Sequence, residues 1–531
     1  MRIVDIIVDN WLRVDGNYLG LDLVEQILDK LTVQNQARIT AEEQGRTWQA
    51  KQMTKEWLLA RFYDREIDGE DPEFNGDWLF MARGFALELK LFLREQGIKV
   101  RWVDRRHWEI GEPYGFEEFS YRGEHQPAAV DAIRRHQQGM YRAPTGAGKT
   151  AVICGFLWET HPESALIYVD RTTLLDQWIQ AIQERIGLPE SEIGRIGGGR
   201  WSTGRITVAT VQSIHRKWDE PRTQKFLRRQ SVTVLDECHH ATAETYRRVL
   251  DSSASRIRLG VSATPDKTGE FDLARLTLGP IFHRDEDEEL RESGILMAPR
   301  VEIVHTPFNK TFWGDHRATR NKRTGRVEEC EVPGCRKSGK VAHGHRNNYQ
   351  QIKQQLVIDK NRNEIIANKI RENLGHCQVV ISSEIGHLDE IWKTLHELGV
   401  KYPYYYTLTS KTKKKDKQEM FEQFDVVPGF VLFSTVAGEG LDIPRIDRIH
   451  LPFPTKNPRT REQELGRGTR IWDGKKDIIA YDYTDPLVSV LASQFRSRLT
   501  ECYQPLGLDV ELDETYAQTI TRNGGLGRGI I

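Results

Sequence analysis

A glycine-rich segment, Ala143-Pro-Thr-Gly-Ala-Gly-Lys-Thr150, carries the strongest chemical signal in the sequence. Gly146 and Gly148 let backbone N–H groups turn toward phosphate oxygens, Lys149 can reach the same oxygens, and the Thr150 hydroxyl suits Mg²⁺. The segment begins with alanine where the commonest P-loop pattern has glycine, and a fortuitous glycine-rich turn is the alternative. The pattern predicts a nucleotide site whose residues are Thr145, Gly146, Ala147, Gly148, Lys149 and Thr150.

A second segment, Val232-Thr-Val-Leu-Asp-Glu-Cys-His239, ends an apolar run with two acids and a histidine. An acid at the tip of a buried strand beside a P-loop suits Mg²⁺, and the next carboxylate could orient or deprotonate an attacking water. A strand followed by an acidic turn is the alternative. A later strand ends in Ser262-Ala-Thr264, and open α/β sheets place ligands beyond the carboxyl ends of their strands. We expect Thr150 and Asp236 to hold Mg²⁺, and Lys149, Asp236, Glu237 and His239 to be catalytic.

The third candidate segment is Gln463-Glu-Leu-Gly-Arg-Gly-Thr-Arg470. Because Arg467 and Arg470 are three residues apart, we expect them to be neighbours on one helical face. Both could then project toward a shared γ-phosphate and stabilise its charge as an arginine finger does. Two arginines on a solvated helix are the alternative. Gln463, Arg467 and Arg470 complete the predicted catalytic set.

A Cys/His cluster forms the fourth candidate, with Cys330 and Cys335 around a Pro-Gly turn and His343 and His345 shortly after. Two thiolates and two imidazoles could close a tetrahedral Zn²⁺ site in a segment with little apolar content. The spacing is not that of a standard zinc finger, and an exposed loop with incidental Cys and His is the alternative. Flanking arginines and lysines could contact DNA phosphates or simply face solvent.

The groups described above must be positioned by strands and helices. Apolar runs of strand length alternate with helical stretches in two series along the chain. This alternation indicates two tandem parallel-sheet α/β domains. The expected strands of the first series are Ala165–Val169, Ile206–Ala209, Val232–Leu235 and Ile257–Val261. Those of the second are Gln378–Ile381, Phe430–Phe433, Ile446–Leu451 and Asp477–Tyr481, with helices at Leu388–Leu398 and Lys414–Phe424. The N-terminal part, with an amphipathic helix at Gly84–Gln96, predicts a small α+β accessory domain.

The expected organisation is an accessory domain (1–112), the first α/β domain (113–300), an inserted basic loop or zinc knuckle (301–350), the second α/β domain (351–510) and a tail (511–531). The net charge of −1 gives no electrostatic argument for a nucleic-acid partner. Acids interrupt the N-terminal apolar run and no stretch is long enough to span a membrane, so we expect a cytoplasmic protein without membrane contact. Six scattered cysteines predict no disulfide framework.

The order of these segments resembles that of superfamily 2 helicases, over about residues 120–500. The glycine-rich loop, the DECH box, the Ser-Ala-Thr triplet and the Gln463–Arg470 segment resemble motifs I, II, III and VI. Motifs Ia, Ic and V are matched by Val169–Trp178, Ile206–Ser213 and Ser434–Asp442. Within the superfamily the chain is most similar to phage UvsW-type helicases, and more distantly to the XPB and RecG group. The segment 75–100 resembles the small substrate-recognition domain of that subgroup.

This resemblance implies two RecA-like domains that hydrolyse ATP with Mg²⁺ at their interface and act on branched DNA in a bacterial or phage-infected cell. It implies that Gln126 reads the adenine, with Arg122 as a second candidate for this contact, and adds Gly440 and Asp442 to the nucleotide site. It also implies nucleic-acid contacts by Arg171, Thr210, Gln212, Ser383 and Thr435. An RNA helicase is a second interpretation, because backbone contacts discriminate sugars poorly. A nucleic-acid-binding scaffold with a vestigial ATPase is the third. Polarity, preferred junction, partner proteins and oligomeric state do not follow from the sequence.

Overall fold

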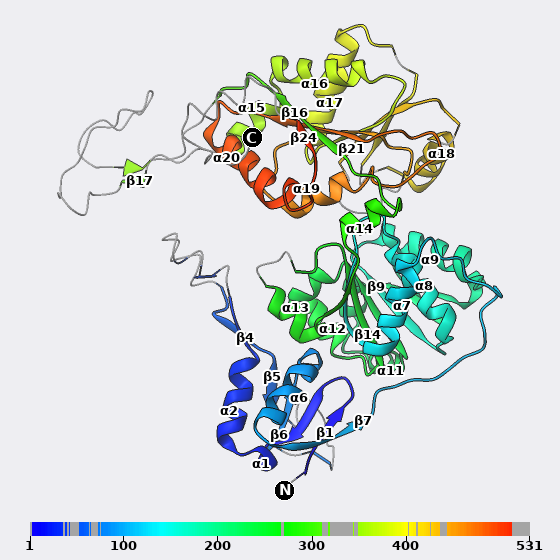
Figure 1. The fold of residues 1–531 in the computed structure, drawn as a ribbon, viewed down its shortest axis with the longest axis vertical. Coiled ribbons are helices and arrows are strands. Elements are labelled where there is room, and N and C mark those ends of the chain that lie inside the picture. Colours follow the sequence, from blue (N-terminus) through cyan, green and yellow to red (C-terminus); the bar gives the residue numbers. More distant parts are fainter. Residues whose placement is uncertain are drawn as a thin grey trace. The chain divides into compact units, whose positions relative to one another are not determined.

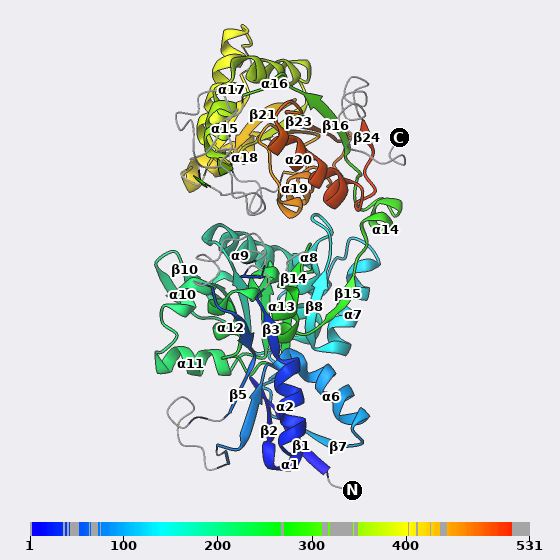
Figure 2. The same ribbon diagram turned by 90° about the vertical axis from the view of Figure 1, so that its left-hand side faces the viewer.

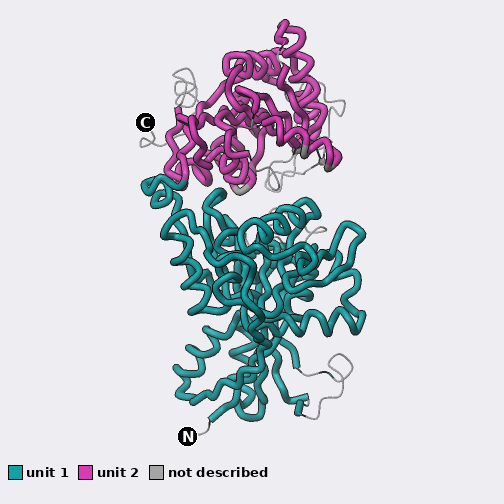
Figure 3. The backbone as a smooth tube through the Cα atoms, turned by 90° about the vertical axis from the view of Figure 1, so that its right-hand side faces the viewer, with its two compact units in different colours: residues 1–295 teal, residues 296–531 magenta. Residues whose placement is uncertain are grey.

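The computed structural model describes residues 3–35, 38–39, 42, 53–62, 64, 73–74, 76–266, 270–310, 317–318, 343–344, 349–401, 403–409, 412–424, 426–435 and 443–511. By internal contacts the chain divides into two compact units, residues 1–295 and 296–531 (Figure 3). The division therefore falls just before the domain boundary predicted at residue 300. The accessory domain and the first α/β domain belong to the same unit.

The larger sheet of the first unit has the strand order β11-β10-β12-β9-β13-β14-β8-β15 and is parallel except for the edge strand β11. Its strands are β8 (Gln138–Arg142), β9 (Ala165–Val169), β10 (Ile193–Gly197), β11 (Arg200–Ser202), β12 (Ile206–Thr210), β13 (Val232–Asp236), β14 (Ile257–Ser262) and β15 (Ile281–Arg284). The four predicted runs each form a strand. Every residue of β9, β12 and β14 is buried, because helices cover both faces of the sheet.

One face of this sheet is covered by α7 (His125–His136), α8 (Lys149–Thr160) and α9 (Thr172–Ile186) (Figure 1). The other face packs against α10 (Val211–His215), α11 (Pro221–Arg228), α12 (Glu244–Leu250) and α13 (Phe271–Leu278). The unit ends with α14 (Asp287–Glu292). Parallel strands between two helical layers bring the carboxyl ends of β8, β9, β12, β13 and β14 to one edge. All five of these strand ends carry a predicted site segment.

The accessory domain is a five-stranded sheet in the order β5-β6-β2-β1-β7 (Figure 2). Its strands are β1 (Ile3–Val8), β2 (Leu12–Asp15), β5 (Ala60–Phe62), β6 (Trp78–Met81) and β7 (Lys99–Asp104). The helices are α1 (Gly16–Leu19), α2 (Leu21–Lys30), the 3-10 turn η1 (Arg83–Phe85) and α6 (Ala86–Glu95), and a short pair β3 (Thr32–Gln34) and β4 (Glu56–Leu58) lies beside them. The predicted helix over 84–96 is thus a 3-10 turn followed by α6. The α+β character is as expected.

The accessory sheet shares its core with helix α13 of the first α/β domain. Ile27 of α2 and Leu89 of α6 pack on one face of the sheet together with Leu273 and Leu276 of α13, and all four side chains are fully buried. The buried Arg83 guanidinium reinforces this junction, because it donates to the Gln138 Oε1 and to the carbonyl oxygens of Asp9, Ser255 and Arg256. An unpaired buried guanidinium would be costly, and four acceptors satisfy this one.

The second unit contains a seven-stranded parallel sheet in the order β20-β21-β19-β22-β23-β16-β24. Its strands are β16 (Arg300–His305), β19 (Cys377–Ile381), β20 (Tyr405–Leu408), β21 (Phe430–Ser434), β22 (Arg448–Leu451), β23 (Ile479–Thr484) and β24 (Val510–Glu511). Helices α16 (Lys360–Glu372) and α17 (Ile385–Glu397) pack on one face. Helices α18 (Lys414–Phe424), α19 (Pro458–Leu465) and α20 (Ser489–Arg498) and the turn η4 (Leu499–Tyr503) pack on the other.

Two sequence expectations about this unit need correction. Residues 300–305 form β16 inside the sheet, so the predicted insertion at 301–350 begins later, and α15 (Tyr349–Val357) already starts before its predicted end. The strands predicted from 446 and 477 begin two residues later, at Arg448 and Ile479, and the two residues before each strand belong to the preceding connection. Among the described residues, none of the helices combines the length and the apolar character needed to cross a membrane.

The junction between the accessory domain and α13 leaves no room at Gly84. A Cβ added there would overlap the backbone oxygens of Arg275 and Leu276, which cannot move without shifting α13. We expect Gly84→Ala to destabilise the first unit by about 3 kcal/mol, as overpacking of a core does. Gly76→Ala is the matched control, since a Cβ at Gly76 meets nothing within 4 Å. Calorimetric unfolding should show a lower transition temperature only for Gly84→Ala. Equal transition temperatures for the two variants would show that α13 shifts to accommodate the added methyl group.

Candidate nucleotide and nucleic-acid site

The glycine-rich loop lies between β8 and α8, at the carboxyl edge of the sheet. Gly146 and Gly148 have φ angles of 89° and 95°, in the left-handed region that glycine adopts without strain. A Cβ on Gly148 would also collide with the Gln126 amide. Conformation and space therefore both require glycine at position 148. Lys149 and Thr150 begin α8, so the positive end of the helix dipole faces the loop, as an anion site needs.

The Lys149 ammonium is held inside the loop. Its Nζ donates to the carbonyl oxygens of Ala143 (3.0 Å) and Pro144 (3.2 Å). These two carbonyls fix the side chain beside the loop, and the Lys149 charge is close enough to Asp236 to oppose the rise in the pKa of that carboxyl. The arrangement suits a cation that attracts phosphate oxygens by exchanging weak carbonyl partners for charged ones.

Residues 122–126 hold the loop from the outside. The Arg122 Nη2 donates to the Gly146 oxygen (2.6 Å), while the His125 Nε2 and the Gln126 Nε2 lie 2.9 Å and 3.1 Å from the Ala147 oxygen. The Gln126 Oε1 accepts from the Arg122 backbone N–H at 2.8 Å. Gln126 is buried and bonded to the loop at one end of its amide, so in this structure it positions phosphate-binding backbone. Its predicted contact with adenine stays a prediction, and sequence reasoning missed His125.

The two acids of the DECH box follow β13 and point to the same edge. The Asp236 carboxylate accepts from the Trp178 indole N–H (2.8 Å) and from the Glu237 backbone N–H (3.0 Å). Burial, and then the neighbouring charge of Glu237, raise the pKa of Asp236 to about 6. Glu237 has φ 50°, a left-handed conformation that is costly for a non-glycine residue and recurs at functional sites. Two partly buried carboxylates side by side provide oxygen ligands that suit a divalent cation, whose charge would offset their repulsion.

The Ser-Ala-Thr strand end meets the DECH box, as their positions in the sequence predicted. The Ser262 hydroxyl donates to the Glu237 Oε2 (3.1 Å), and the His239 Nδ1 lies 3.2 Å from the Ser262 Oγ and 3.3 Å from the Glu237 Oε2. The Thr264 backbone N–H donates to the Ser262 Oγ (3.2 Å). The Glu237 carboxylate is therefore fixed by Ser262 of β14 and by His239 of the 3-10 turn that follows β13, which is what a group that orients water requires.

In the second unit the expected helical pair of arginines is wrong. Helix α19 ends at Leu465, and Arg467 lies in the following turn, while Arg470 forms an isolated antiparallel bridge with Leu296. The two glycines between Leu465 and Thr469 explain the difference, because glycine ends helices and permits tight turns. Gln463 remains on α19.

A buried ion cluster anchors α19 to the sheet. The Arg461 Nη1 lies 3.1 Å from the Glu464 Oε2, and its Nη2 lies 3.8 Å from the Asp482 Oδ1 on β23. The Arg498 Nε and the Tyr503 hydroxyl donate to the same aspartate at 2.8 Å and 2.7 Å. Although burial opposes it, Arg498 and Arg461 hold the pKa of Asp482 below its ordinary value. This cluster sets the direction in which the chain leaves α19.

Three of the predicted nucleic-acid contacts follow the ends of β9 and β12 in the first unit. The exposed side chains of Arg171 and Gln212 both reach Asp170, at 3.1 Å and 3.4 Å. The Thr210 Oγ1 donates to the Ser213 Oγ (2.7 Å). In the second unit Ser383 is exposed, and the Thr435 backbone N–H donates to the Leu408 oxygen (3.2 Å). These positions stay predictions as nucleic-acid contacts.

Several predicted residues lie outside the described part of the chain. These are Gly440 and Asp442 of the nucleotide site and Cys330, Cys335 and His345 of the zinc cluster. His343 is described only as backbone of β18 (His343–Gly344), which pairs with β17 (Arg317–Ala318). Among the described residues there is no group of three or more potential metal-ligating side chains. The zinc site therefore stays a prediction.

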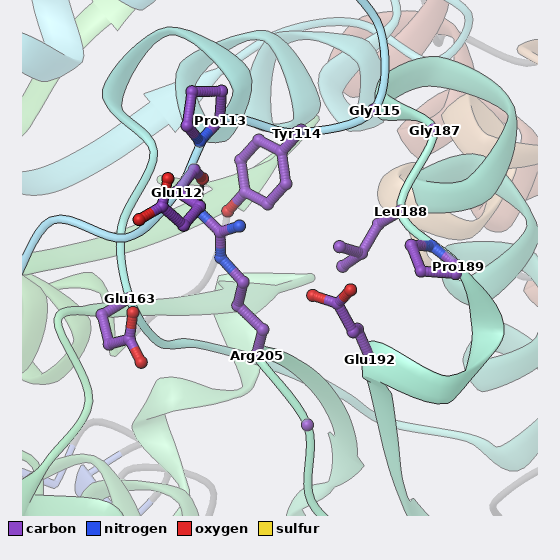
Figure 4. A pocket seen from close by; sticks show the side chains of 11 residues that line it. Glu112, Pro113, Tyr114, Gly115, Glu163, Gly187, Leu188, Pro189, Glu192 and Arg205 are labelled. Carbon is purple, nitrogen blue, oxygen red and sulfur yellow. Dashed lines mark hydrogen bonds between the residues drawn. The ribbon is translucent and has the colours of Figure 1, made fainter.

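A cavity of about 650 Å³ lies at the amino ends of β9, β10 and β12, the edge opposite the P-loop (Figure 4). Arg205 crosses it over the Tyr114 ring, 4.1 Å from the ring centre, and also donates to the Glu112 backbone oxygen. Glu163 and Glu192 line the same cavity. The segment that joins the accessory domain to α7 is anchored here, so the cavity belongs to that connection and not to the nucleotide site.

Two family models match this chain in the order of the two α/β domains. "Type III restriction enzyme, res subunit" matches residues 119–267, and "Helicase conserved C-terminal domain" matches residues 359–471. Both segments carry the motifs described above. The pairing of these two matches agrees with the resemblance seen in the sequence.

Named relatives show the same pattern. The DNA 3'-5' helicase XPB of Kineococcus radiotolerans is 34% identical over 65% of this chain and 56% of its own length. The DNA 3'-5' translocase XPB2 of Sulfurisphaera tokodaii is 34% identical over 32% of this chain and 36% of its own length. The chain thus spans about half the length of these relatives or less. The crystal structure of UvsW from T4 aligns with 96% of this chain and 99% of its own, at 14% identity and a TM-score of 0.39.

The site geometry separates the roles of Lys149 and Glu237. We expect Lys149→Ala to weaken nucleotide binding, because the loop loses its cation, whereas Glu237→Gln should still bind ATP but lose hydrolysis by about 10²- to 10⁴-fold. Glu163→Gln is the matched control, since this exposed glutamate lines the cavity at the opposite edge. Nucleotide titrations and phosphate release distinguish the variants. Unimpaired turnover in Glu237→Gln would remove this residue from the catalytic role.

Proposed function

This chain belongs to the superfamily 2 helicases, and we propose that it is an ATP-dependent DNA helicase or translocase that acts on forked or recombination DNA intermediates. The observation that carries the proposal is the cluster at one sheet edge: the Lys149 loop, the Asp236–Glu237 pair and Ser262. These groups supply the phosphate cradle, the cation site and the base that phosphoryl transfer to water requires. Fold resemblance alone would not support an activity, but this constellation does.

The residues fit Mg²⁺, because the partly buried Asp236 carboxylate lies beside a second carboxylate and receives two N–H donors among the described contacts. Asp236 and the Thr150 hydroxyl would hold the ion. When bound, Mg²⁺ neutralises phosphate charge. Glu237, oriented by Ser262 and His239, accepts the proton of the attacking water. Lys149 and the loop N–H groups hold the β- and γ-phosphates. Gln463, Arg467 and Arg470 of the second unit, with Gly440 and Asp442, are assigned to the nucleotide by the family resemblance.

The choice of DNA rests on the relatives, whose printed names describe DNA helicases and translocases. The choice of branched DNA rests on the UvsW-type resemblance of the N-terminal segment. An RNA helicase is the second candidate function, because contacts to phosphates carry little information about the sugar. A scaffold with a vestigial ATPase is disfavoured, because Lys149, Asp236 and Glu237 are all present and lie at the same edge of the sheet.

ATP turnover on a panel of nucleic acids tests this proposal. We expect single-stranded, forked and four-way DNA to stimulate turnover, with forked and four-way DNA most effective and matched RNA weaker. Stimulation should fall steeply with salt, because phosphate contacts release counterions. Glu237→Gln controls for contaminating ATPases. Equal stimulation by RNA would overturn the choice of DNA, and an absence of stimulation by every nucleic acid would overturn the motor function.

We also propose that Cys330, Cys335, His343 and His345 hold one structural Zn²⁺. The support is compositional: a basic segment without apolar periodicity cannot offset its ordering entropy by burial, whereas a metal site supplies about 10 kcal/mol. Elemental analysis of protein purified without a metal-affinity tag should find one equivalent of zinc, and the double variant Cys330→Ser, Cys335→Ser should lose it. Less than about a tenth of an equivalent, with full DNA-stimulated turnover, would contradict the proposal.

A further inference from the structure

Asp170, at the carboxyl end of β9, forms hydrogen bonds with two of the side chains that are predicted to contact nucleic acid, Arg171 and Gln212. Its Oδ2 lies 3.1 Å from the Arg171 Nε, and its Oδ1 accepts from the Gln212 Nε2 at 3.4 Å. Arg171 and Gln212 are exposed, whereas the Asp170 side chain is mostly buried. The mostly buried aspartate therefore restrains two exposed side chains. Burial opposes ionisation, but the Tyr246 hydroxyl and the nearby His240 hold the pKa of Asp170 below its ordinary value.

Tyr246 of α12 completes this arrangement. Its hydroxyl donates to the Asp170 Oδ1 at 2.6 Å and accepts from the Gln212 Nε2 at 3.3 Å. Its exposed fraction is 6%, and its ring packs in the core between the sheet and α12. A single buried hydroxyl is therefore bonded both to the aspartate and to one of the two surface side chains. Hydrogen bonds to a charged partner are the stronger kind, so this contact restrains both groups.

Tyr246 is also connected to the DECH-box acids by a series of contacts that includes two histidines. The Tyr246 ring stacks on His240 (centroids 5.5 Å), and His240 contacts the ring of His239 (4.1 Å). His239 in turn lies against the Glu237 carboxylate and the Ser262 hydroxyl. A continuous series of described contacts thus joins Asp170 to Glu237 within one domain. Coupling between two sites needs such a physical connection.

Helix α9 provides a second connection from the same corner. It begins at Thr172, directly after Arg171, and one of its buried side chains, Trp178, donates its indole N–H to Asp236 at 2.8 Å. A displacement of Arg171 along the helix axis would therefore move a hydrogen bond to the predicted Mg²⁺ ligand. The two connections end on the two different acids of the DECH box.

We propose that Tyr246 is a positioning residue that holds Arg171 and Gln212 through Asp170 and links nucleic-acid occupancy to the acid pair through His240 and His239. This inference rests on the proposed function, since it assigns the coupling between nucleic acid and ATP turnover to named side chains. The structural alternative is that Tyr246 only fills the core. The two roles differ in the hydroxyl, because phenylalanine keeps the ring contacts and removes both hydrogen bonds.

Tyr246→Phe and Tyr168→Phe form a matched pair. Both tyrosines lie in the same buried cluster, but the Tyr168 hydroxyl makes no hydrogen bond to any described residue. The readout is the ratio of DNA-stimulated to basal ATP turnover, together with the DNA concentration at half stimulation. We expect Tyr246→Phe to lower the ratio by about tenfold, the effect of losing one hydrogen bond to a charged group, and to raise the half-saturating concentration. Tyr168→Phe should leave the ratio unchanged.

A double-mutant cycle with Asp170→Asn sharpens the test. If Tyr246 acts through Asp170, the combined variant should lower the ratio no further than the stronger single variant, since residues in one network are non-additive. An unchanged ratio in Tyr246→Phe, including the case in which basal and stimulated turnover fall together, overturns the inference and leaves the proposed function standing. An additive cycle also overturns it. Wild-type protein without any DNA stimulation would overturn the proposed function, and this inference with it.

Discussion

Two carboxylates of like charge lie side by side at the end of β13, partly removed from water, and the surrounding structure is arranged around them. At Asp236, burial and the neighbouring charge of Glu237 both favour the neutral acid, so each nearby donor stabilises its ionised form. Trp178, the Glu237 backbone N–H, Ser262 and His239 all direct polar hydrogens or ring nitrogens toward these oxygens. They come from α9, β13, β14 and the turn between them. The order of the parallel strands makes this convergence possible.

The strand pattern could be predicted from the sequence, because parallel strands buried on both faces are nearly continuous apolar runs. Β9 is an example, and it coincides with the predicted run Ala165–Val169. The P-loop and the DECH box could also be predicted, because their chemistry depends on short local spacing. The rule that ligands bind beyond the carboxyl ends of strands predicted that the Ser-Ala-Thr triplet and the DECH box would lie at the same edge, but it did not predict the hydrogen bond between Ser262 and Glu237.

The contacts that the sequence did not predict join residues far apart along the chain. The indole of Trp178 looks like one more core side chain in the periodicity of α9, and only the fold brings it to Asp236. His125 and Tyr246 carry no local signal of their hydrogen bonds for the same reason. The predicted arginine pair is wrong for a different reason. A spacing of three places two residues on one helical face only within a helix, and glycines interrupt this segment after Leu465. In this segment the glycines determine the local structure, and the helical spacing of the arginines does not.

The core shared by the accessory sheet and α13 has a consequence for the way the chain is made. The side chains of α2 and α6 are synthesised first, but Leu273 and Leu276, which complete their burial, leave the ribosome only after the whole region from β8 to β14. Contacts of such long sequence separation form slowly, since a large loop must close before burial rewards it. Until α13 has been made, the nascent accessory sheet therefore lacks part of the cover of its apolar face.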